Sequence, residues 1–178
     1  QSYSNYEIFI SDDNSTDKSS EICINYSNAD HRIRYLRQKT HLGEHRNKFY
    51  LVNNAKGKYF KLLDQDDYLI DTTYLGSMVA KLDEGYDYGI SNVDVETIEA
   101  SGNISVKTNT MNCFANCITP FDFMLSTLDE SAMIIYGMHN RSNFKIYYEE
   151  YVKEFSNSKH FTEGILNHKI ASRCKGFY

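Results

Sequence analysis

The first half of the chain alternates short apolar runs with segments whose apolar residues recur at helical spacing. This alternation predicts βαβ units, and therefore an α/β fold with a mostly parallel sheet flanked by helices. Runs of β-branched and aromatic residues predict buried strands over 6–11, 32–37 and 59–63. The polar segments between these runs, which contain spaced apolar residues, predict two helices. The first ends near residue 28 and the second near residue 55.

Capping residues suggest where these two helices begin and end. Ser15 or Thr16 is positioned to cap the first helix, and Asp17 suits the positive end of its dipole. Gly57 is a suitable C-cap for the second helix.

The second half continues with a clear amphipathic helix over 71–83. Leu75, Met78, Val79 and Leu82 recur at the spacing of one helix face. No repeat or linker divides the chain, so we expect one domain over residues 1–178. The remaining pattern predicts strands over 88–98 and 131–138, a hairpin turn at 101–103, and helices around 121–128, 148–155 and 163–172.

Composition and charge exclude some classes of function. The net charge is −5 with lysine and arginine scattered, which argues against a nucleic-acid surface. No apolar run approaches the ~20 residues of a membrane-spanning helix. Of four cysteines only Cys113 and Cys117 lie close, without a second pair or a histidine at zinc spacing. We expect reduced cysteines and a cytoplasmic protein. Core packing is the expected role of most of the 15 tyrosines.

Acidic residues follow two of the predicted strands. Asp12 and Asp13 come after the first strand, and Asp64, Asp66 and Asp67 come after the third. Ligands of open α/β sheets bind at the carboxyl ends of strands. If the two strands are parallel neighbours, the carboxylates gather at one edge and repel each other unless solvated or neutralised. Mg²⁺ or Mn²⁺ would neutralise them and bridge to phosphate oxygens.

Several common ligand-binding motifs do not fit these acids. An EF-hand that started at Asp64 would need glycine at Leu69 and glutamate at Leu75, so that motif fails. A P-loop motif is absent, and a receiver-type phosphoacceptor site does not explain two acids separated by one residue. The alternative that the acids in these segments only cap helices stays open, above all for Asp17 and Asp71.

Several segments, in order, resemble the nucleotide-sugar glycosyltransferases of family 2, which have the GT-A fold. The segment "EIFISDDNSTDKSSEI" resembles the family's strand, DD-x-S-T-D turn and helix. The segment "IRYLRQKTHLGEHRNKFYLVNNAKGKYFKLLDQDDYL" resembles its glycine loop, Arg-Asn helix start and LDxDD segment. "SNVDVETIEASGNI" resembles the strand and hairpin that follow, and "YGMHNRSNFK" and "TEGILNHKIASRCKGFY" are weaker matches. The resemblance implies a Rossmann-like GT-A domain, with a nucleotide-binding half over 1–100 and an acceptor-side half over 101–178.

The resemblance also implies roles for individual residues. Asp13 would accept a hydrogen bond from the donor's base, commonly uracil. Asp64, Gln65 and Asp66 would form the DxD motif, with Asp66 as the metal ligand and the other two near the ribose. Arg46 would lie close to the nucleotide.

Two further roles concern the sugar and the acceptor. Asn92 would approach the donor sugar, although Arg46 and Asn92 are equally well explained as a surface helix start and a strand end. Glu163 in "FTEG" matches the catalytic base, which activates the acceptor hydroxyl. Many members carry aspartate there, often in an acidic pair. The departure leaves the base open, with helix capping as the other reading of Glu163 and with Glu149, Glu150 and Asp122 as further candidates.

The predicted activity is therefore that of an inverting, metal-dependent glycosyltransferase. It would move a hexose-type sugar from a nucleoside diphosphate, with UDP the first to try, to a glycan or lipid-linked acceptor in glycan or polysaccharide synthesis. Its location would be cytoplasmic, with peripheral contact at the inner face of a membrane. The rival interpretation is a non-catalytic nucleotide-sugar-binding relative or an inactive fragment. A nucleotidyltransferase would need a glycine-rich phosphate loop, which the sequence lacks.

The start of the chain differs from that of the family. Members begin with an apolar strand, a loop and a helix before the segment that matches 6–11 here. In the family, that first strand lies between the strands that match 6–11 and 59–63 here. We therefore expect either a longer natural chain, which we favour, or a sheet that has closed by direct pairing of these two strands, because unpaired buried strand edges are costly.

Overall fold

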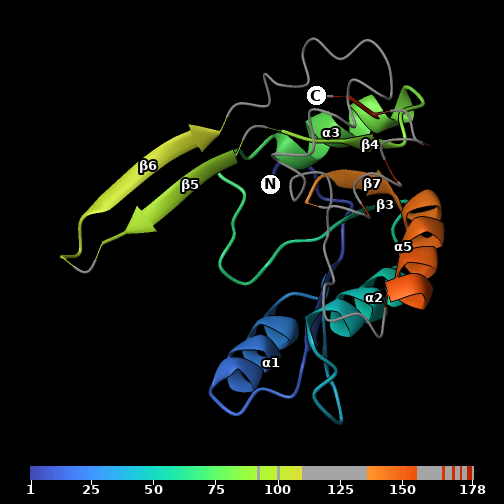
Figure 1. Cartoon of the computed structure of the whole chain (residues 1–178). Helices are drawn as coiled ribbons and strands as arrows, with labels where there is room; N and C mark the ends of the chain where they lie inside the picture. The colour runs from blue at the N-terminus through green and yellow to red at the C-terminus, as the bar shows by residue number, and fades with distance from the viewer. Residues whose placement is uncertain are drawn as a thin grey trace.

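A computed structural model describes residues 1–91, 93–99, 101–109 and 136–155, together with the single positions 166, 170, 173, 176 and 177. Strands and helices alternate through its first part, which confirms the α/β class (Figure 1). Among the described residues, no helix has the length and apolarity that crossing a membrane requires.

The first two strands form a parallel pair joined by a helix. β1 (Ile8–Asp12) lies beside β2 (Ile33–Arg37), with Ile8 opposite Ile33 and Asp12 opposite Arg37. α1 (Ser19–Ala29) connects the two strands and packs against both. The predicted first βαβ unit is thereby confirmed.

A second sheet contains four strands in the order β3-β7-β4-β8. Its strands are β3 (Tyr59–Lys61), β7 (Met138–Asn140), β4 (Tyr88–Gly89) and β8 (Gly176–Phe177). β7 runs antiparallel to both of its neighbours, whereas β4 and β8 are parallel. This sheet is therefore mixed rather than mostly parallel, because β7 enters it from the opposite direction.

The two strands that precede the acidic segments lie in different sheets. β1 pairs with β2 and β3 pairs with β7, and no ladder among the described strands joins β1 to β3. Direct pairing of β1 with β3, one of the two expected arrangements, is therefore not what the structure has. The ends of these strands are instead brought together by α2 (Glu44–Asn54).

A hairpin projects from the rest of the chain (Figure 1). β5 (Val93–Ile98) and β6 (Ile104–Asn109) pair antiparallel, and Gly102 takes a positive φ of 85° in the turn. The turn was predicted, but the single strand expected over 88–98 is two strands. Tyr88 and Ile90 are buried, whereas the hairpin that follows alternates apolar and polar residues on two exposed faces.

The main core lies between α2, β3, β4 and α5 (Arg141–Phe155). Tyr88, Tyr148 and Tyr151 are almost fully buried, which confirms a packing role for several of the tyrosines. α3 (Tyr74–Asp83) buries Met78 and Leu82 against β7, as its predicted apolar face requires. The main core consists of Val52, Phe60, Leu62, Tyr88, Ile90, Phe144, Tyr148, Tyr151, Leu166 and Ile170.

Two of the predicted helix caps are wrong. Lys18 is the N-cap of α1 and makes no side-chain cap, so neither Ser15 nor Thr16 caps the helix. Asp17 supports the first turn instead, since its Oδ1 accepts the Ser19 N–H at 2.9 Å.

At the end of α2, the C-cap is Ala55 in an extended conformation and not Gly57. Gly57 is required by close packing instead. A Cβ at this position would lie 2.8 Å from the Tyr59 carbonyl oxygen, which is too close.

Candidate functional site

Asp12, the first acid after β1, is a structural residue. Its side chain is buried, and its carboxylate accepts hydrogen bonds from the Ser15 N–H at 2.7 Å, the Ser20 hydroxyl at 2.6 Å and the Tyr35 hydroxyl at 2.7 Å. Burial alone would raise the pKa of Asp12, but these hydrogen bonds outweigh it and hold the pKa well below its usual range. Asp12 therefore ties the end of β1 to α1 and β2 and is not available to a ligand.

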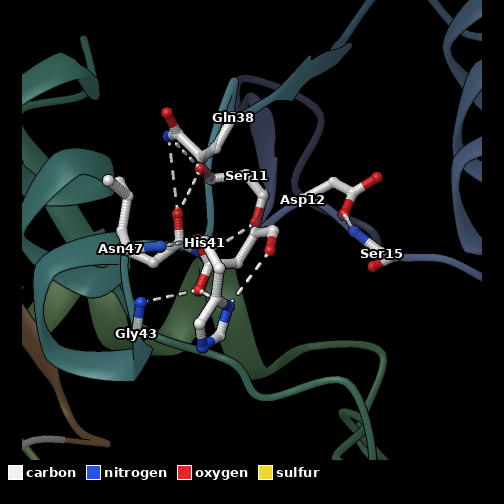
Figure 2. Close-up of polar contacts among 9 residues, drawn as sticks. Ser11, Asp12, Ser15, Gln38, His41, Gly43 and Asn47 are labelled. Carbon is white, nitrogen blue, oxygen red and sulfur yellow. Dashed lines mark hydrogen bonds and ion pairs between the residues drawn. The ribbon is translucent and has the colours of Figure 1, made fainter.

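Asp13, the second acid, holds the loop that precedes α2. Its Oδ1 accepts the Leu42 N–H at 2.7 Å, and its Oδ2 accepts the Gly43 N–H at 2.9 Å. The Nδ1 of the exposed His41 lies 2.9 Å from the same Oδ2 (Figure 2). Each carboxylate oxygen has two acceptor positions, so Oδ1 keeps one for a ligand.

Gly43 gives the loop a backbone shape that other residues avoid. It is the N-cap of α2 and has φ 83° and ψ 158°, a region populated almost only by glycine. Its carbonyl accepts the Asn47 N–H at 3.0 Å, so Gly43 joins the loop to the first turn of the helix. The glycine loop of the family resemblance thus has a local physical reason.

A polar network fastens the start of α2 to the end of β1 (Figure 2). The Ser11 hydroxyl donates to Asn47 Oδ1 at 2.6 Å, and the Asn47 amide donates to the Ser11 carbonyl at 2.8 Å. Gln38, just after β2, donates to the Ser11 hydroxyl at 2.8 Å. The network fixes the position of the helix start relative to Asp13.

The residue after Asn47 reaches the acidic segment that follows β3. Lys48 is buried, with 8% of its side chain exposed, and its Nζ lies 2.7 Å from Glu44 Oε1 and 3.4 Å from Asp64 Oδ2. The Tyr136 hydroxyl donates to the same Asp64 oxygen at 3.0 Å. Burial alone would lower the pKa of Lys48, but the hydrogen bond to Glu44 and the charge of Asp64 raise it, so the ammonium stays charged.

Lys48 and Tyr136 were not among the site residues that the sequence predicted. The Glu44–Lys48 spacing indicates a helix-surface ion pair, and no pattern in the sequence shows that this lysine turns inward.

The segment after Asp64 is an exposed turn. The Asp67 N–H donates to the Asp64 carbonyl at 3.1 Å, while Gln65, Asp66 and Asp67 are exposed. A second lysine, Lys61, lies on the strand before the turn and donates to the Tyr136 carbonyl. Burial lowers the pKa of Lys61 to about 8, against the opposing effect of the Asp67 charge.

The fit of a metal ion can be judged from this turn. Within the described residues, no three His, Cys, Asp or Glu side chains form a group that could hold a metal. Mg²⁺ is usually bound by one or two carboxylates plus waters and substrate phosphates. The exposed Asp66 fits that kind of shared site, and it does not fit a cage made of protein ligands alone.

The structure describes some of the other predicted site residues and not others. Arg46 is exposed in the first turn of α2, next to the residues that hold both strand ends. Asn92, Glu163 and the further candidate Asp122 lie outside the described residues, so their roles stay predictions. On α5, Glu149 is half-buried and Glu150 pairs with Arg173 at 3.0 Å.

The fold and the site define an α/β protein whose candidate ligand-binding residues follow two strands and meet at one helix. The model of the family "Glycosyl transferase family 2" matches residues 1–160. This chain therefore belongs to glycosyl transferase family 2, as its motifs indicated.

Curated relatives carry glycosyltransferase names. The chain is 35% identical over 106 residues to a GalNAc(5)-diNAcBac-PP-undecaprenol beta-1,3-glucosyltransferase of Campylobacter jejuni, covering 59% of this chain and 33% of the relative. It is 40% identical over 85 residues to glycosyltransferase GlyA of Streptococcus pneumoniae, which covers 47% of this chain and 12% of GlyA. For GlyG of the same organism the identity is 40% over 78 residues, with shares of 42% and 26%. The matches span a third or less of the length of these relatives.

Proposed function

We propose that this chain carries the donor site of an inverting, metal-dependent glycosyltransferase that uses a nucleoside-diphosphate sugar, with UDP as the first nucleotide to test. The observation that carries the proposal is the start of α2, where Asn47 contacts the end of β1 and Lys48 contacts the end of β3. Family membership supports sugar transfer as the reaction class.

The nucleotide would lie between Asp13 and the turn at Asp64. Asp13 keeps an acceptor position on Oδ1, which suits the N3–H of uracil. Arg46, exposed in the same first turn of α2, would contact the phosphates as a bidentate donor. Gln65 and Asp64 would face the ribose, and Asn92 would contact the donor sugar.

Asp66 would hold Mn²⁺ or Mg²⁺ together with oxygens of the donor's diphosphate. Such an ion, when bound, supplies charge stabilisation for the leaving diphosphate without needing a proton from the protein. The exposure of Asp66 is compatible with this role, since a shared ion needs an open carboxylate.

The acceptor hydroxyl would be activated by Glu163. The oxygen of the acceptor hydroxyl would form a bond to the anomeric carbon while the bond from that carbon to the diphosphate breaks. The hydroxyl proton would pass to the Glu163 carboxylate. Attack from the side opposite the diphosphate inverts the configuration. The products are the glycosylated acceptor and the nucleoside diphosphate.

The acceptor class comes from the Campylobacter relative, whose name includes an undecaprenol-linked glycan. We infer a glycan or lipid-linked acceptor for this chain as well. With such an acceptor, the enzyme would work in the cytoplasm, in peripheral contact with the inner face of the membrane.

A thermal-shift panel tests the proposal. UDP, UDP-glucose, UDP-N-acetylglucosamine and ADP are each added with and without Mn²⁺. A ligand at a hundred times its dissociation constant adds about 2.7 kcal/mol to the free energy of unfolding, which is readily detected. A shift with uridine nucleotides that needs Mn²⁺ supports the donor site, and the same result without turnover of any donor favours the non-catalytic relative. No shift with any nucleotide overturns the proposal.

A further inference from the structure

Lys48 is a buried lysine in the first half of α2, next to the proposed donor site. Only Asp12, Lys48 and His139 are buried polar or charged residues in the part of the chain that the structure describes. A buried ammonium group costs free energy unless it is paired and hydrogen-bonded. Lys48 meets this condition through Glu44 and Asp64, so its partners decide what its charge does.

The contacts of Asp64 are one-sided. Both the Lys48 ammonium, at 3.4 Å, and the Tyr136 hydroxyl, at 3.0 Å, approach Oδ2 of the carboxylate. The hydrogen bonds that this carboxylate accepts from described residues all end on Oδ2. The carboxylate is therefore held in one rotation, with Oδ1 left as an acceptor for a ligand.

The charge of Lys48 also acts on the turn as a whole. Asp64, Asp66 and Asp67 place three carboxylates within four positions, where the proposed ligand brings a negative diphosphate. Lys48 is shielded from water, so its attraction for these anions is screened less than that of a surface lysine. A buried cation under the turn makes the approach of an anionic ligand less unfavourable.

We propose that Lys48 is a positioning residue of the donor site: with Tyr136 it holds Asp64 so that Oδ1 faces the donor's ribose, and it offsets the negative charge of the turn. Lys48 does not itself touch the donor. This inference rests on the proposed function, because it assigns Lys48 a part in the same site.

Binding of UDP in the presence of Mn²⁺, measured by calorimetry on the whole chain, tests the inference. Lys48→Met keeps the length of the side chain and removes the charge, and it should weaken UDP binding at least tenfold. Tyr136→Phe removes the hydrogen bond to Asp64 Oδ2 and the one that the hydroxyl accepts from Lys48 Nζ at 3.3 Å, without a change of charge, and it should weaken binding by a smaller factor. Tyr136→Phe also serves as the test if Lys48→Met does not fold.

Lys58→Met is the matched control. Lys58 likewise forms a lysine–aspartate pair, with 2.5 Å between its Nζ and Asp83 Oδ1, but it is mostly exposed and lies at the other end of β3. This variant should bind UDP as the wild type does. Equal losses for Lys48→Met and Lys58→Met would mean that only net charge matters, which overturns the positioning role.

A measurement without ligand separates failure of this inference from failure of the proposed function. The midpoints of urea unfolding are compared for Lys48→Met, Asp64→Asn and the double variant. Coupled residues give a double variant that is less destabilised than the sum of the single variants. Additive shifts, or wild-type UDP affinity in a folded Lys48→Met, overturn the role of Lys48 while the donor site stands. A wild type that does not bind UDP overturns the donor site and the role of Lys48 with it, whatever the urea cycle shows.

Discussion

Asn47 and Lys48 are consecutive residues of α2, and they contact the ends of two different sheets. Asn47 donates to the Ser11 carbonyl on β1 at 2.8 Å, and Lys48 lies 3.4 Å from Asp64 just after β3. Adjacent residues of a helix point about 100° apart. One turn of α2 can therefore contact both strand ends, although the two strands do not pair.

The first prediction concerns the metal ligand. Asp66→Asn should abolish the Mn²⁺-dependent part of nucleotide binding, because it removes the exposed carboxylate that would share the ion with the diphosphate. The fold should persist, with the free energy of unfolding changed by no more than about 0.5 kcal/mol. Calorimetry with UDP and Mn²⁺ measures the effect.

Glu99→Gln provides the control for the loss of one exposed carboxylate. Glu99 lies at the far end of the β5–β6 hairpin and should have no effect on binding. Unchanged UDP affinity in Asp66→Asn would sink the metal assignment.

The second prediction separates two roles of Asp13. Asp13→Asn should reduce binding of UDP more than that of ADP, because a carboxamide alters the acceptor that would pair with the uracil N3–H. Affinities for both nucleotides are measured with the variant and the wild type. Losses of the same size for both would show that Asp13 acts only through the loop at Leu42 and Gly43, which it holds by two backbone hydrogen bonds.

The third prediction concerns the pH dependence of stability. The pKa of Asp12 is lowered in the folded protein, so its contribution is fully present above the ordinary aspartate pKa of about 3.9 and is lost as the pH falls toward the folded value. At pH 7, Asp12→Asn should reduce the free energy of unfolding by about 1–3 kcal/mol, since an NH2 group replaces one of the two carboxylate oxygens that accept hydrogen bonds from Ser15, Ser20 and Tyr35. The gap to the wild type should narrow below about pH 4.

Urea unfolding at pH 7 and pH 3 checks this expectation. Asp17→Asn is the comparison, and it should have a much smaller effect because Asp17 is exposed. A gap of the same size at both pH values would mean that Asp12 stabilises the fold through packing and not through its charge.

The fourth prediction concerns the base. Glu163→Gln should reduce turnover by about two to four orders of magnitude and leave donor binding unchanged, since general-base catalysis contributes on that scale. Steady-state kinetics and UDP titration are both needed to see the split. Should turnover fall little, Asp122, Glu149 and Glu150 become the residues to replace, with Glu150 the least suited because Arg173 pairs with it.

The sequence predicted local structure where periodicity was strong. The apolar face of Met78 and Leu82 lies inside, and the turn at 101–103 joins two strands. Caps were less predictable, because several neighbouring residues can bind the same N–H. Ser15 has a side chain that could cap, but α1 begins at Ser19, and the Ser15 N–H donates to Asp12.

The arrangement of strands could not be obtained from local patterns. Which strands pair depends on residues that are distant along the chain, and a short apolar run gives no sign of its neighbour. The antiparallel entry of β7 was missed for this reason, and the same limit left open whether β1 would pair with β3. The same holds for Lys48, whose burial depends on Asp64 and on Tyr136.

The last prediction concerns the backbone of the loop before α2. Gly43→Ala places a Cβ on a residue with φ 83° and ψ 158°, and such strain costs about 1–3 kcal/mol. Nothing lies within 4 Å of the added Cβ, so the cost is conformational and not a clash. Relief of the strain would move the Gly43 N–H away from Asp13 and shift the first turn of α2, and UDP affinity should therefore fall along with stability.

Gly102→Ala is the control for Gly43→Ala. It adds the same kind of strain at φ 85° in the hairpin turn, also with nothing within 4 Å. It should lower stability yet leave UDP affinity as in the wild type. If both variants lose affinity to the same degree, the loss follows from general destabilisation, and the loop at Gly43 has no special part in forming the site.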